Sequence, residues 1–212
     1  MVHVPDLIRD KLIVPDGYRF ALLYRQEYSR QANGITIPKD MGRPIWTMDA
    51  TTKPMPHDEA LAFEAKMETL DGGLGTFNAW DVRKPYPSAY RNGDFADTGK
   101  IGTIGSNRKS LSLYNLPGNF ALSMGDYLSF QGHGWASLHR IVQAVTANGS
   151  GVTAQFEIRP HLWFTVDVDT PVVLKKPYTV MSVIPGSIAP SQHDALHSVV
   201  TFQAYQVPYS GS

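Results

Sequence analysis

The chain has 212 residues, and its 19 Lys and Arg balance 19 Asp and Glu, so it carries no formal net charge at pH 7. On folding, a chain of this length buries roughly 70% of the surface that its unfolded form exposes, so it needs no disulfides or metal ions to be stable. Neutrality removes the bulk attraction to nucleic acid or anionic lipid, and the absence of cysteine excludes disulfides and thiolate sites. We therefore expect one domain over residues 1–212 whose partners are held by shape.

The N-terminal residues 1–15 alternate small apolar residues with charged ones. They lack the uninterrupted apolar stretch of a signal peptide, and we expect them to form an N-terminal arm. No later stretch approaches the ~20 apolar residues that cross a bilayer, so a soluble protein without membrane insertion is expected. Residues 20–24 and 44–48 are candidate strands.

One segment, from about residue 56 to 71, has the pattern of an amphipathic helix. Proline at position 56 suits a first turn, and the glycine pair at 72–73 supplies a left-handed stop. The apolar residues recur at helical spacing and should pack against the rest of the protein. They are Ala60, Phe63, Met67 and Leu70.

The stretch from about 80 to 110 is rich in Pro, Gly and polar residues and has few apolar periods. This composition predicts a long loop that carries at most one hairpin. Loops of this length in compact proteins usually reach a partner or a ligand.

Beyond this loop the sequence has the period of two that is typical of strands. Residues 151–159 show it best, with Val152, Ala154, Phe156 and Ile158 expected to face a core. Residues 200–205, 127–130 and 138–145 are further candidates, and turn-forming residues separate them at hairpin spacing. The expected fold is therefore mainly β, an antiparallel β-sandwich or barrel-like domain with one α-helix and one long loop.

Several residues imitate catalytic motifs without completing them. His193 and His197 have the spacing of a zinc-binding helix, but Asp194 stands where the motif needs Glu. The other candidate general bases have no nucleophile motif nearby, and glycines in the long loop have the wrong spacing for a phosphate loop. These residues are His133, His139 and His161, and Gly99, Gly102 and Gly105.

The acidic residues are scattered, without the paired carboxylates that a hydrolase of cell-wall glycans requires. No catalytic residue, no cofactor and no metal is therefore expected, and we do not expect an enzyme.

Aromatic residues form 11% of the chain, and several fall in expected loops. Their rings would stack on sugars, pack in a core or contact a second subunit, and the sequence leaves these alternatives open. Those expected to be exposed are Trp46, Trp80, Tyr86, Tyr90, Trp135 and Trp163, and all but Trp46 are candidate interface or loop contacts.

The order of short patterns over residues 56–205 resembles that of minor tail proteins of long-tailed bacteriophages, in the distal-tail-protein-like class. The helix at 59–70 leads into GGLGTF at 72–77, and MGDYLSF at 124–130 resembles the family's Gly-Asp strand opening. A strand, a hairpin turn and a closing strand follow in the family's order. They are LHRIV at 138–142, ANGSG at 147–151 and FEIRPHL at 156–162.

The resemblance implies a virion protein that is made in the cytoplasm of the bacterial host. Six copies would form a ring at the distal end of the tail tube. The ring would contact the tail tube protein on one side and hub or fibre proteins on the other. The alternative from the aromatic residues is a carbohydrate-binding β-sandwich that recognises the host surface.

Overall fold

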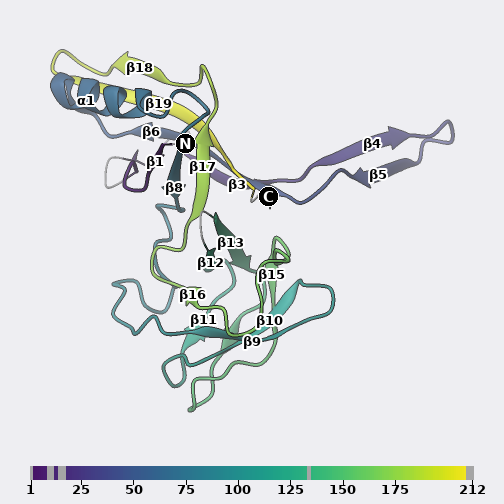
Figure 1. The fold of residues 1–212 in the computed structure, drawn as a ribbon. Coiled ribbons are helices and arrows are strands. Elements are labelled where there is room, and N and C mark those ends of the chain that lie inside the picture. Colours follow the sequence, from purple (N-terminus) through teal and green to yellow (C-terminus); the bar gives the residue numbers. More distant parts are fainter. Residues whose placement is uncertain (1, 9–11, 14–17, 133–134, 209–212) are drawn as a thin grey trace.

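The computed structural model describes residues 2–8, 12–13, 18–132 and 135–208. The described chain is mainly β, with one helix, two large sheets and a two-stranded hairpin that projects to one side (Figure 1). Each large sheet has its own cluster of buried apolar side chains. The predicted fold class is confirmed. Within the described residues, no helix combines the length and apolar character needed to cross a bilayer.

The first large sheet has nine strands and holds both ends of the described chain (Figure 1). Its order is β1-β8-β17-β19-β6-β2, with β3 on β6 and with β7 and β18 on β19. All its pairings are antiparallel except the parallel pair β1–β8. The strands are β1 (His3–Val4), β2 (Leu12–Ile13), β3 (Arg19–Leu23), β6 (Ile45–Thr52), β7 (Met55–Pro56), β8 (Thr76–Ala79), β17 (Thr179–Val183), β18 (Ala189–Gln192) and β19 (His197–Gln206).

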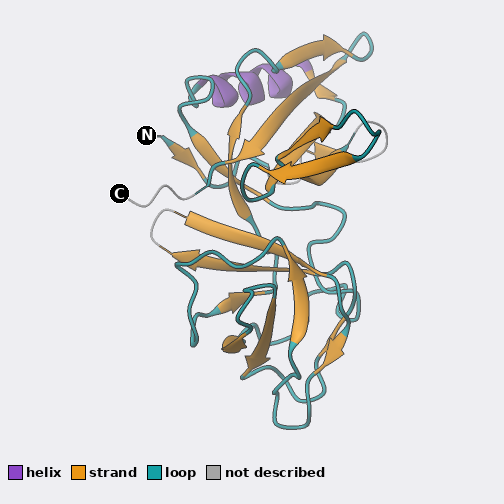
Figure 2. Ribbon diagram, turned by 90° about the vertical axis from the view of Figure 1, so that its right-hand side faces the viewer, coloured by secondary structure: helices purple, strands orange, loops and turns teal. Residues whose placement is uncertain are grey.

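Helix α1 (His57–Glu68) lies along the nine-stranded sheet, as Figure 2 shows in purple. All four apolar residues of the predicted stripe are buried, and the ring of Phe63 lies 6.3 Å from that of Phe202 on β19. After the helix, Asp71 and Gly72 take positive φ and reverse the chain. The predicted helix and its buried face are confirmed, although the helix ends at Glu68, before the predicted end, and of the glycine pair only Gly72 takes positive φ.

The second large sheet has six strands in the order β16-β12-β13-β15-β10-β9, and it curls into a nearly closed barrel. A bridge between Lys100 and Pro171 joins β9 to the residue before β16, and Val172 N donates to Gly99 O at 2.9 Å. The strands are β9 (Lys100–Ile104), β10 (Ser110–Tyr114), β12 (Tyr127–Gly132), β13 (Trp135–Ile141), β15 (Phe156–Arg159) and β16 (Val172–Val173), with a small separate pair, β11 (Ala121–Leu122) and β14 (Val145–Thr146).

The strand predicted at residues 151–159 is wrong over its first half. Residues 152–155 are not a strand, and Thr153 is buried while Val152 is exposed, the reverse of the expected phase. The cause is a local contact, since Leu113 N donates to Thr153 Oγ1 at 2.9 Å and Thr153 N donates to Leu113 O at 2.9 Å. Only Phe156 and Ile158 are buried as predicted, within β15.

Part of the expected N-terminal arm belongs to the nine-stranded sheet. His3–Val4 form β1 and Leu12–Ile13 form β2, while Leu7 and Ile8 are buried. Within 1–15, residues 1, 9–11, 14 and 15 lie outside the described residues. At these described positions the chain is held in the fold and does not extend from it.

Residues 80–99, between β8 and β9, form the long loop. The rest of the predicted stretch forms the β9–β10 hairpin, which is the one hairpin that the prediction allowed. Two carboxylates hold the loop against the barrel. Asp126, which is fully buried, accepts hydrogen bonds from Ser88 N at 2.9 Å and Ser123 N at 2.8 Å, and it pairs with Lys84 Nζ at 3.0 Å. Asp97 accepts from the backbone nitrogens of residues 174 and 175. The loop is therefore anchored along its length.

The two large sheets meet around Trp46 of β6, which is fully buried. Its Nε1 donates to Leu138 O on β13 at 2.8 Å, which joins the nine-stranded sheet to the barrel. Its ring stacks on Phe20 at 5.1 Å and meets the edge of Tyr127 at 5.7 Å. The expected exposure of Trp46 is wrong, because this side chain is the central contact between the sheets.

Tyr127 extends this contact with a buried polar group. Its hydroxyl donates to Asp81 Oδ2 at 3.0 Å and accepts from Arg140 Nε at 3.2 Å. Burial first, and then the negative charge of Asp81, raise the pKa of Tyr127 to about 12. The hydroxyl therefore stays protonated and remains a donor at physiological pH.

The turn after α1 gives a test of packing. An added Cβ at Gly75 would lie 2.7 Å from the Cα of Leu70, so the backbone would have to move. We expect Gly75→Ala to lower the free energy of unfolding by about 1–3 kcal/mol, as overpacking usually does. Gly149→Ala is the matched control, because nothing lies within 4 Å of its Cβ position. Equal urea denaturation midpoints for the two variants would contradict this packing.

Candidate assembly surface

The β4–β5 hairpin is the most conspicuous feature that sequence reasoning missed. Strand β4 (Gln26–Arg30) pairs with β5 (Thr36–Asp40), with Tyr28 opposite Pro38. The turn between them is well formed, since Gln31 N donates to Ile35 O at 2.8 Å and Gly34 takes φ +85°. The hairpin extends away from both large sheets (Figure 1).

Every strand residue of this hairpin is exposed. Tyr28 is 66% exposed, and Ile35 and Ile37 are 56% and 46% exposed. Among the described strands, β4 and β5 pair only with each other. An isolated two-stranded hairpin is at best marginally stable in water, and an exposed apolar surface of this kind is a candidate interaction site.

The hairpin continues β3 and β6 through a break in the ladder. Leu23 and Ile45 form the last pair in the nine-stranded sheet, and Gln26 and Asp40 form the first pair in the hairpin. Between these two pairs, residues 24–25 on one strand segment lie opposite residues 41–44 on the other. Gly42, in the longer segment, takes φ +133°. Such a bulge redirects a strand pair, which explains why the hairpin leaves the sheet.

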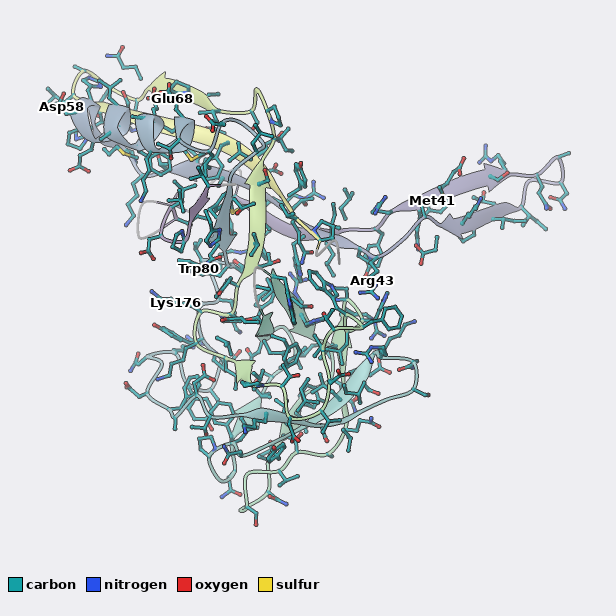
Figure 3. All side chains as sticks on the ribbon, viewed as in Figure 1. Met41, Arg43, Asp58, Glu68, Trp80 and Lys176 are labelled. Atoms are coloured by element: carbon teal, nitrogen blue, oxygen red, sulfur yellow. The ribbon has the colours of Figure 1, made fainter. Side chains whose placement is uncertain are left out.

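A second exposed apolar surface, the helix-end surface, lies where α1 begins. His57 connects α1 to the β18–β19 turn, with Nδ1 2.8 Å from Ser198 Oγ and Nε2 3.2 Å from Ala195 O. Leu61, one helical turn after His57, is 61% exposed, and Leu196 in the turn is 71% exposed. We define the helix-end surface by these two leucines and Asp58. It lies on the opposite side of the molecule from the hairpin, as the labels Asp58 and Met41 show in Figure 3.

The candidate contact aromatics are spread over three places. Trp80 lies under the Nζ of Lys176 at 5.6 Å (Figure 3). Tyr90 stacks on Phe120 at 4.3 Å, and Tyr86 packs beside Gly93 in the same loop. Their role in an interface stays a prediction.

The remaining two candidates come together at one end of the barrel. The rings of Trp135 and Trp163 lie 5.7 Å apart, although residues 135 and 163 belong to different parts of the chain. Trp163 is 8% exposed and therefore mainly a packing residue. Trp163 also lines a pocket at the base of the β4–β5 hairpin.

The candidate general base His139 is locked in the core. Its Nδ1 donates to Pro160 O at 2.7 Å, so its Nε2 accepts from Ser137 Oγ at 2.6 Å. Neither side chain is exposed, so a substrate in solution has no access to this serine–histidine pair. The pair therefore forms hydrogen bonds within the core and has no contact with solvent.

The other histidine candidates show no metal site. His197 Nδ1 lies 2.9 Å from Asp194 Oδ1 in the β18–β19 turn, and His193 is exposed beside it. His133 lies outside the described residues. Across the described chain, no three His, Asp or Glu side chains are grouped so as to hold a metal ion.

A scan against protein-family models finds no match for this sequence, and a search of curated proteins finds no matching protein. The assembly surfaces therefore rest on the geometry of this chain.

Burial of His139 predicts a pH-dependent stability. Burial chiefly lowers its pKa to about 4, with smaller contributions from His161 and Arg43, whereas an unfolded histidine has a pKa of about 6.5. Between these values the unfolded chain binds a proton that the folded chain excludes. The stabilisation is therefore present above pH 6.5 and is lost progressively as the pH falls to 4, by up to ~3 kcal/mol.

Replacement of the imidazole should remove this part of the pH dependence. We expect the free energy of unfolding of His139→Asn to fall less between pH 6.5 and 4 than that of the unchanged protein, by up to one proton in slope. Urea denaturation at a series of pH values measures both slopes. Parallel curves for the two proteins would contradict a neutral, buried His139.

Proposed function

We propose that this chain is a structural protein that assembles with copies of itself into a closed ring. The observation that carries this proposal is the β4–β5 hairpin, whose apolar side chains lie outside both cores of their own chain. A second copy is the occupant that this geometry favours, because an apolar surface of the same chain, the helix-end surface, is exposed on the opposite side.

A contact between two different surfaces is heterologous. Repeated from copy to copy, it produces a ring when the rotation closes and a filament when it does not. In a closed ring every hairpin is covered and no helix-end surface is left free. Six copies are the number that the sequence resemblance implies.

Apolar side chains are proposed to hold the contact. The hairpin carries two cations, Arg30 and Lys39, and two carboxylates, Glu27 and Asp40, so it has no net charge to steer a partner. Pro38 and Pro190 lie in β5 and β18, and proline has no backbone N–H to donate to a ladder. Side-chain packing is therefore favoured over strand addition at these edges. A stable contact of this kind would bury on the order of 2,000 Å² in total.

The phage assignment is supported by the ordered patterns between residues 56 and 205, several of which occupy matching elements. The residues of the GGLGTF pattern follow α1 and enter β8, and those of the LHRIV pattern lie in or next to β13. We propose a ring at the tail tip of a long-tailed bacteriophage, between the tail tube protein and the hub or fibre proteins. This role requires no cofactor and no chemistry, and its place is the virion.

Removal of the apolar residues of the hairpin tests the ring directly. We expect the unchanged protein to have a native mass of about six protomers by light scattering, and the double variant Tyr28→Ser, Ile37→Ser to be monomeric. Its melting temperature as a monomer should match that of the diluted, dissociated protein, because the hairpin contributes to neither core.

The control removes exposed apolar side chains elsewhere. Met124 and Val168 are 70% and 51% exposed and lie outside both the hairpin and the helix-end surface. The variant Met124→Ser, Val168→Ser should assemble like the unchanged protein. An unchanged protein that stays monomeric at high concentration, or a hairpin variant that still assembles, would overturn the proposal.

A further inference from the structure

A pocket of about 420 Å³ opens at the base of the β4–β5 hairpin, where the nine-stranded sheet approaches the barrel. This volume lies within the range of pockets that hold small molecules. Its wall includes Arg25, Arg43 and Ile45 from the hairpin base and Trp163, Phe164 and Thr165 from the segment after β15. The pocket thus combines apolar rings with two guanidinium groups.

The apolar side of the pocket is an exposed ring on a rigid support. Phe164 is 77% exposed, which is unusual for an aromatic side chain that has a defined place. Its segment is held by Arg108, whose guanidinium donates to the carbonyl oxygens of Leu162, Trp163 and Val166. The guanidinium of Arg43 lies 4.8 Å from the centre of the Phe164 ring. The ring and this cation are therefore positioned together before any ligand binds.

Among the residues that the structure describes, the positive side of the pocket has no carboxylate paired with it. Neither Arg25 nor Arg43 forms an ion pair with any described residue. Asp40, at the end of β5, instead accepts a hydrogen bond from Gly42 N at 3.1 Å. Partial burial, and then the charge of Arg108, lower the pKa of Arg43. A bound anion would relieve this uncompensated charge.

Guanidinium groups bind carboxylates through two parallel hydrogen bonds, while an aromatic ring takes the apolar face of a sugar or a second ring. We propose that this pocket binds a small organic anion in which a carboxylate is attached to a ring with an apolar face. Thr165, which also lines the pocket, has a hydroxyl group that can hydrogen-bond to such an anion. Two sources share this chemistry, the uronic acid of a surface polysaccharide and a free aromatic carboxylate.

This site goes beyond ring assembly and does not depend on it. Among the candidate contact aromatics, only Trp163 lines it; Trp80, Tyr86 and Tyr90 do not. In the proposed ring, the hairpin variant that fails to assemble should still bind the anion, because Tyr28 and Ile37 do not line the pocket.

Titration followed by tryptophan fluorescence tests the site, with the hairpin variant Tyr28→Ser, Ile37→Ser measured beside the unchanged protein. The probes are glucuronate, glucose, which has the same ring without the carboxylate, and benzoate. We expect at least one of the two carboxylates to bind at least tenfold more tightly than glucose. Tighter binding of glucuronate indicates a sugar acid, and tighter binding of benzoate indicates an aromatic acid. Failure of both carboxylates to exceed glucose would overturn the proposal.

Two variants separate the site from general charge effects. Arg43→Gln and Phe164→Ser should each weaken binding of the preferred carboxylate at least tenfold while keeping the melting temperature of the unchanged protein. Arg91→Gln is the control, because Arg91 is an exposed arginine of the long loop and does not line this pocket. Equal affinities for Arg43→Gln and Arg91→Gln would show that the carboxylate is not held by Arg43.

Discussion

The side chain of Trp46, buried between the two large sheets, holds the nine-stranded sheet and the barrel together. The indole has one N–H, and the structure pairs it with Leu138 O of the barrel, so the nine-stranded sheet is held in one orientation. The backbone N of Trp46 donates to Gln206 Oε1, and Gln206 Nε2 donates to Thr179 Oγ1, which in turn donates to Ala136 O. These buried polar atoms are paired, so the contact is directional as well as apolar.

The same strand also determines where the hairpin begins. Trp46 follows Ile45, which is the first residue of β6 and pairs with Leu23 of β3 next to the bulge. The bulge therefore lies directly beside a fixed point of the fold. Apolar residues beyond it extend into solvent on a ribbon whose base is held firmly. This combination of an anchored base and an uncovered end is the basis of the proposed assembly with a second copy.

Much of the fold could be predicted from the sequence, namely the helix and the strands that bury only one of their two faces. In α1 and β19 one face is buried and the other is more open to solvent, so the periods of 3.6 and 2 appear in the residue order. In the β4–β5 hairpin both faces are exposed, and no alternation marks it. The sequence around Asn33-Gly34 carries a turn signal, and this signal between two β-forming stretches was the clue to the hairpin.

The candidate sites were harder to predict for a related reason. The aromatic content is visible in the sequence, but whether a ring is buried depends on contacts between distant residues, such as Trp46 with Leu138 and Trp135 with Trp163. The exposed Phe164 and its neighbour Arg43 are 121 positions apart and share no motif. Only the fold brings them together.

In the proposed ring, the hairpin of one copy contacts the helix-end surface of the next. Because the chain contains no cysteine, single cysteines can be introduced without competing pairs. One preparation would carry Tyr28→Cys and another Leu61→Cys, and both would be oxidised alone and as a mixture. We expect a disulfide-linked pair of chains in the mixture and much less in either preparation alone. An assembled mixture that forms no such link, or that links no more than the separate preparations, would contradict the claim.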